Sequence, residues 1–84
     1  ATALTEFRLL AQQGNASAQS NLGFMYSEGQ GVLQDYVQAH MWVNLAAVQG
    51  KESYWESRDK LAERMTPAQI AEAQQLAREW KAKQ

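Results

Sequence analysis

His40 is the one side chain in this sequence whose ordinary pKa suits acid–base or metal chemistry near neutral pH. A metal site needs three or four ligands, which helices commonly supply with His-x-x-x-His or Glu-x-x-His spacing. Neither spacing occurs here. His40 stands four residues before Asn44, on the least apolar side of a predicted helix. We therefore expect a partly exposed histidine and no metal site.

Nucleophilic and phosphate-binding chemistry also lack the residues they need. The chain has 0 cysteines, which excludes thiolate zinc sites, disulfides and cysteine nucleophiles. No serine lies in a Gly-x-Ser-x-Gly elbow. Gly29-x-Gly31 could begin a dinucleotide-binding fingerprint, but Gln34 replaces the third glycine and no strand is predicted before it. We expect no catalytic residue and no cofactor, and interpret the two glycines as a connection between helices.

The composition excludes further classes of protein. The chain has 84 residues, enough for one small domain. Its net charge of −1 does not favour binding to nucleic acid or an anionic membrane surface. With 45% hydrophobic residues it is too apolar for disorder, yet its apolar runs are too short to span a bilayer. A chain without cysteine suits reducing and oxidising compartments alike, so the localisation stays open.

Apolar residues recur at helical spacing in five segments, and no stretch alternates with period two. We expect an all-α fold with helices at about 1–13, 16–28, 35–49, 52–65 and 67–80. Asn15, Asp35 and Thr66 are suitable N-caps, and the cations in 81–84 suit the end of the last helix. The helix at 35–49 is apolar around most of its circumference, which predicts a central position.

Three further expectations concern packing. Gly23 is predicted to lie where two helices approach closely. Trp55 and Trp80 could anchor a partner, since aromatic residues are common hot spots, but they fall on apolar stripes, which favours a place in the core. Charges of opposite sign lie three or four residues apart in 51–64, which is typical of a solvated helix face.

The chain contains an internal repeat. Leu10-Ala11-Gln12-Gln13-Gly14 aligns with Ala46-Ala47-Val48-Gln49-Gly50, and Ala47 lies 36 residues after Ala11. A period near this value is typical of one helix pair in a helical solenoid. Residues 11–50 resemble a Sel1-like repeat, a family related to the tetratricopeptide class of α/α solenoids, on these motifs: Gly14-Asn15-Ala16-Ser17-Ala18-Gln19, Asn21-Leu22-Gly23, Met25-Tyr26, Gly29-Gln30-Gly31-Val32, Gln34-Asp35-Tyr36, Ala39, Trp42 and Ala46-Ala47 with Gln49-Gly50.

The resemblance implies a single Sel1-like repeat domain over 1–84. In it, 1–13 is the second helix of a truncated preceding repeat, 15–50 is one complete repeat, and 51–84 is a degenerate C-terminal capping helix pair. The pattern degenerates after about residue 53: Arg58, Asp59 and Met65 stand 36 residues after Leu22, Gly23 and Gly29. Loss of inward apolar positions is typical of a terminal layer whose outer face meets water.

The first helix of each pair in such a solenoid lines the concave side, where partners bind. Its packing stripe in this chain is predicted to be Ala18, Leu22, Met25 and Tyr26. The residues left to face a partner are Ser17, Ser20, Asn21, Phe24, Ser27 and Glu28.

The resemblance implies a noncatalytic bacterial adaptor or scaffold that binds a protein or peptide. Two alternatives stay open. One is a structural module that forms a homodimer through a bare face of the N-terminal helix, made of Leu4, Phe7 and Leu10. The other is a small hydrolase-like or ligand-binding domain, since some cysteine-rich relatives of the family bind β-lactam-type substrates. The absence of cysteine disfavours it.

Overall fold

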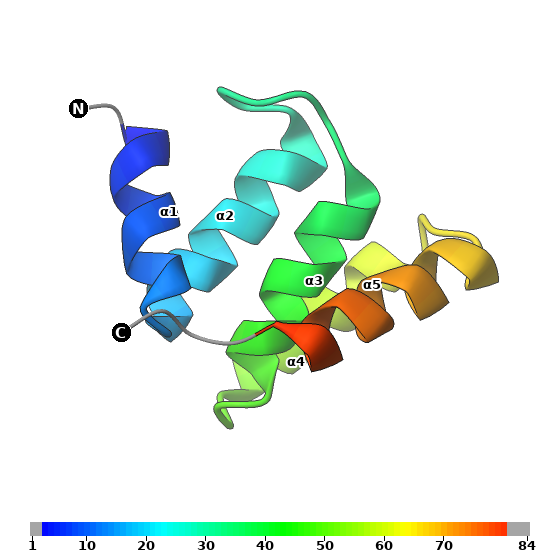
Figure 1. Ribbon diagram of the computed structural model, residues 1–84. Helices are drawn as coiled ribbons and strands as arrows, with labels where there is room; N and C mark the ends of the chain where they lie inside the picture. The colour runs from blue at the N-terminus through cyan, green and yellow to red at the C-terminus, as the bar shows by residue number, and fades with distance from the viewer. Residues whose placement is uncertain (1–2, 81–84) are drawn as a thin grey trace.

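A computed structural model describes residues 3–80 of the protein. Five helices and no strand occur in this range, so the predicted all-α helical-repeat fold is confirmed (Figure 1). The prediction for the cations in 81–84 lies outside the described residues. The helices are α1 (Ala3–Gln12), α2 (Ala16–Glu28), α3 (Tyr36–Ala47), α4 (Glu52–Ala62) and α5 (Pro67–Glu79).

Local capping fixes where three helices begin. The Asn15 side chain accepts a hydrogen bond from the Ala18 backbone N–H at 2.9 Å, and Asp35 accepts one from Gln38 at 3.1 Å. Thr66 forms a reciprocal capping box with Gln69 before Pro67. These three predicted caps are confirmed.

The C-terminus of α2 and the two termini of α4 depend on different features. At Gly29 the backbone adopts a left-handed conformation with φ of 70°, which favours glycine and ends α2. Lys51 precedes α4 without a side-chain cap, and α4 ends at Ala62 rather than at the predicted residue 65.

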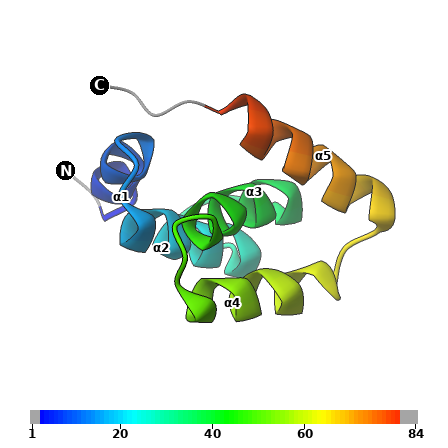
Figure 2. The same ribbon diagram turned by 90° about the horizontal axis from the view of Figure 1, so that it is seen from below.

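The helices form a layered stack around α3. Figure 1 shows α2 and α3 running antiparallel, joined by the loop that holds Gly29 and Gly31. Figure 2 shows α3 between α4 on one side and α5 on the other. Helix α3 packs against α2, α4 and α5, as its apolar circumference predicts. It supplies most buried side chains: Ala39, His40, Met41, Trp42, Val43, Leu45, Ala46 and Ala47.

Gly23 lies at the closest approach of α2 and α3. A Cβ atom added there would meet the Val43 side chain and lie 3.0 Å from the Ala39 carbonyl oxygen. Only a residue without a side chain allows this approach, so the predicted close contact is confirmed.

Equivalent positions of the 36-residue repeat make the same hydrogen bond. Gln19 Nε2 donates to the Ala11 carbonyl at 3.1 Å, and Trp55 Nε1 donates to the Ala47 carbonyl at 2.7 Å. Gln49 Nε2 joins the two turns by donating to Gly14 O at 3.0 Å and to Gln19 Oε1 at 3.1 Å. The turn between α1 and α2 is therefore tied to the turn between α3 and α4.

The structure corrects the prediction for His40. Its exposed fraction is 2%, and it faces the interior of the stack. The sequence pattern marked this side of the helix as the least apolar, but α4 brings Arg58 and Asp59 near it. The Nδ1 atom has no hydrogen-bond partner in the described part of the chain.

The two tryptophans of the C-terminal region behave differently. Trp80 packs edge-on against Trp42, with ring centroids 5.8 Å apart, so its predicted place in the core is confirmed. Trp55 remains half-exposed, and the prediction for it is wrong. Its indole nitrogen is held by the Ala47 carbonyl at the turn before α4, which leaves part of the ring in solvent.

The bare face predicted for α1 is also wrong in part. Leu4 and Phe7 pack against the core because α1 turns them toward α2. The large apolar residues that α1 leaves exposed are Leu9, at 57%, and Leu10, at 42%.

Candidate partner-binding groove

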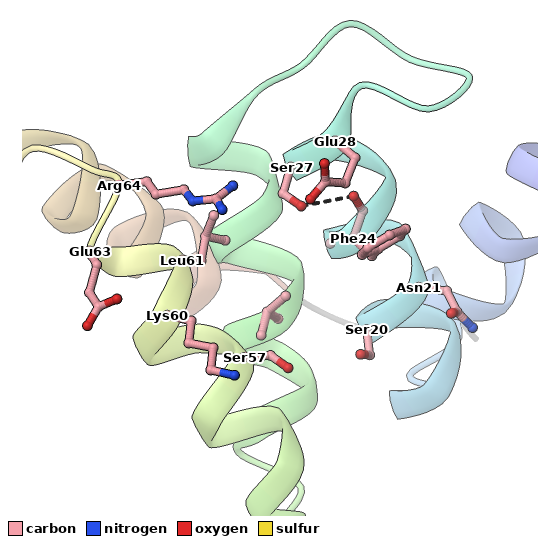
Figure 3. Close-up of a pocket in the computed structure, with 12 residues that line it drawn as sticks. Ser20, Asn21, Phe24, Ser27, Glu28, Ser57, Lys60, Leu61, Glu63 and Arg64 are labelled. Carbon is pink, nitrogen blue, oxygen red and sulfur yellow. Dashed lines mark hydrogen bonds between the residues drawn. The ribbon is translucent and has the colours of Figure 1, made fainter.

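An open groove of about 610 Å³ runs between α2 and α4 (Figure 3). Gly23 and Val43 are among the residues that line it where α2 and α3 meet. The absent side chain at Gly23 therefore lets Val43 of α3 approach α2 at this part of the groove. The groove is lined by Ser20, Asn21, Gly23, Phe24, Ser27 and Glu28 from α2, Val43 from α3, Ser57, Lys60 and Leu61 from α4, and Glu63 and Arg64 after α4.

Five of the six residues predicted to face a partner line this groove. They are Ser20, Asn21, Phe24, Ser27 and Glu28. Ser17 is exposed but lies outside the lining. The geometry of α2 explains the clustering: the stripe of Ala18 and Leu22 is buried against the core, and the lining residues occupy the opposite side.

Phe24 is the largest apolar side chain in the groove lining, and 54% of its surface is exposed. It follows the buried Leu22 by two residues, which turns it about 200° away around the helix. The Phe24 carbonyl accepts a hydrogen bond from Ser27 Oγ at 2.9 Å, drawn in Figure 3. The α2 wall therefore offers an aromatic surface among small polar groups.

The second wall of the groove was missed by the sequence analysis, which interpreted it as a solvated face. Ser57, Lys60, Leu61 and Arg64 recur at spacings of three and four residues and so lie on one side of α4 and its continuation. Leu61, the buried member of α4, marks the side that turns inward. The helical spacing of charged residues around Leu61 was the signal that could have found them.

The charges of the groove are largely unpaired. Lys60 and Arg64 belong to the α4 wall, while Glu28 belongs to the α2 wall. The ion pair found among residues 3–80 lies elsewhere, between Arg58 Nε and Asp59 at 3.3 Å. The groove charges thus stay available to a bound molecule.

The side chains of the lining are hydroxyl, amide, charged and apolar groups. It contains neither histidine nor cysteine, and the hydroxyls of Ser27 and Ser57 donate to helix carbonyls. His40 lies outside the lining, and burial, with Arg58 adding to it, lowers its pKa below 6.5. In the described range no cluster of carboxylate, histidine or cysteine side chains could hold a metal ion.

The comparison with known families concerns the α2–α3 pair. The model of the Sel1 repeat matches residues 16–51, which include both helices and the glycine loop. Residues 16–51 are a Sel1 repeat. The expected family is therefore confirmed, whereas most of α4 lies beyond the matched Sel1 residues. No curated protein matches the chain.

The Sel1 match bears on function at a coarse level. Sel1 repeats are in general noncatalytic modules for protein–protein interaction. Within residues 3–80 no helix is both long and apolar enough to cross a membrane.

Proposed function

We propose that this protein is a noncatalytic interaction module, a bacterial adaptor or scaffold that offers the α2–α4 groove to a protein or peptide partner. The observation that carries this proposal is the half-exposed Phe24 inside a groove with a polar rim. Aromatic side chains are common hot spots where a partner shields them from water. The Sel1 family supports interaction as the general role.

The layer assignment belongs to the same proposal. We take 1–13 as the second helix of a preceding repeat, 15–50 as a complete repeat and 51–84 as a degenerate capping pair. The equivalent hydrogen bonds of Gln19 and Trp55 support this register, because their acceptors Ala11 and Ala47 are also 36 residues apart.

Selection from a phage-displayed library of random dodecapeptides tests the groove. We expect selected peptides to bind about tenfold more weakly after Phe24→Ala, as expected for loss of an aromatic hot spot. Leu9→Ala is the matched control, because Leu9 is a similarly exposed apolar residue on a helix outside the groove. Equal loss in both variants, or no loss in Phe24→Ala, would refute the assignment of the groove.

Self-association through α1 is the second candidate, and the exposed Leu9 and Leu10 favour it. A copy that covered these leucines would remove apolar surface from water. Sedimentation at several concentrations tests this: a dimer that Leu9→Asp dissociates supports it, and a monomer throughout excludes it. Phe7→Asp is the poorer test because Phe7 packs against the core.

A further inference from the structure

Two cations line the α4 side of the groove about one helical turn apart. Figure 3 shows the Lys60 side chain reaching into the groove and Arg64 extending toward the end of α2 that carries Ser27 and Glu28. Glu63 points away from α2 in the same view. The charge pattern inside the groove is therefore set by Lys60, Arg64 and Glu28.

These three charges are not evenly balanced along the groove. Glu28 lies at the end that Arg64 approaches, so this end carries charges of both signs, and no ion pair joins these two residues. Lys60 lies near the end lined by Ser57 and Ser20, whose hydroxyls are neutral. No residue in 3–80 forms an ion pair with Lys60.

A partner that fills the groove must either cover the Lys60 ammonium group or pair with it. Covering Lys60 with an apolar or basic group would remove water from a charge without compensation, which disfavours binding. A carboxylate placed there satisfies the charge and adds a charge-assisted hydrogen bond. Phe24, on the facing wall, favours a large apolar neighbour.

We infer that the groove selects a peptide segment that carries an acidic side chain for Lys60 and a large apolar side chain for Phe24. This inference rests on the proposed binding function and adds the chemistry of the partner. Repulsion of basic segments by Lys60 and Arg64 would contribute to the selectivity as much as attraction does.

The dodecapeptide selection is repeated with the wild type, Lys60→Glu, the neutral Lys60→Gln and the control Arg78→Glu. Arg78 is an exposed cation of α5 outside the groove lining, so its reversal changes the net charge equally. A melting curve for each variant verifies folding. Lys60→Gln, which introduces no new charge, provides the same readout if the reversal unfolds the chain.

We expect wild-type selections to be enriched in Asp or Glu near Phe, Leu or Trp, and Lys60→Glu selections to shift to Lys or Arg. A synthetic acidic peptide from the wild-type selection should bind about threefold more weakly to Lys60→Gln and about tenfold more weakly to Lys60→Glu. Arg78→Glu should bind it as the wild type does.

The outcomes separate the two proposals. Peptides that require Phe24 but show no acidic preference, or the same preference after Lys60→Glu, overturn this inference and leave the groove as the binding site. An equal loss in Arg78→Glu also overturns it, because only net charge would then matter. Binding that is independent of Phe24 overturns the proposed function itself.

Discussion

Replacing Gly23 by alanine tests the packing on which the groove depends. The new methyl group would collide with the Val43 side chain and lie 3.0 Å from the Ala39 carbonyl oxygen. Val43 is buried and β-branched, so it has little freedom to rotate away. Overpacking of this kind costs about 1–3 kcal/mol, against which alanine regains about 1 kcal/mol of helix propensity over glycine.

The expected net loss for Gly23→Ala is therefore about 0–2 kcal/mol, with Gly23→Leu losing more. For a domain of this size that loss lowers the melting temperature by up to about 16 °C. Thermal unfolding followed by circular dichroism measures it. Ser17→Ala, at an exposed position of the same helix, is the control and should change stability by no more than about 0.5 kcal/mol.

A double-mutant cycle with Val43→Ala identifies the cause. Removing the Val43 methyl groups makes room for the new side chain, so Gly23→Ala should cost less in that background. A higher melting temperature for Gly23→Ala, or an equal change in both backgrounds, would refute the close α2–α3 contact.

Two further predictions concern buried polar groups. Burial, reinforced by Arg58, holds the pKa of His40 below 6.5 in the folded state. The unfolded chain therefore binds the proton more readily than the folded chain does. The free energy of unfolding should fall as the pH decreases below 6.5 toward the folded-state pKa. Urea unfolding at pH 7.5 and 5.5 should give a smaller pH effect in His40→Gln than in the wild type, and identical effects would contradict the argument. Gln19→Ala removes two hydrogen bonds, from Gln19 to the Ala11 carbonyl and from Gln49 to Gln19, whereas the Ala11 carbonyl keeps the bond it accepts from the Gly14 N–H. At about 0.5–1.5 kcal/mol for each bond lost, we expect a loss of about 1–3 kcal/mol. Gln75→Ala, which loses an exposed bond to Glu79, is the control, and equal melting temperatures for the two variants would show that the buried bonds contribute nothing.

Local chemistry made most of the fold predictable. Asn15, Asp35 and Thr66 act within three residues of themselves, so their caps can be recognised without knowing the tertiary structure. The burial of His40 depends instead on α4, which reaches it from a different layer. The sequence of α3 alone could not reveal that α4 covers His40.

The groove was predictable on one wall only. The positions of Ser20, Asn21 and Phe24 follow from the packing stripe of α2 and the solenoid arrangement. Lys60 and Arg64 belong to a segment where the repeat pattern degenerates, and alternating charge concealed their common side. Which charged residues face a groove is decided by how the next layer docks, and that requires the structure.

Trp55 stands 36 residues after Gln19, and an indole in place of an amide changes what this position can bind. Gln19 both donates to Ala11 and accepts from Gln49, so it joins the end of α1 to the turn after α3. An indole nitrogen can donate but has no acceptor. Trp55 therefore preserves the bond to Ala47 and ends the relay of side-chain amides. An amide that approached Trp55 as Gln49 approaches Gln19 would find no side-chain oxygen to accept its hydrogen bond.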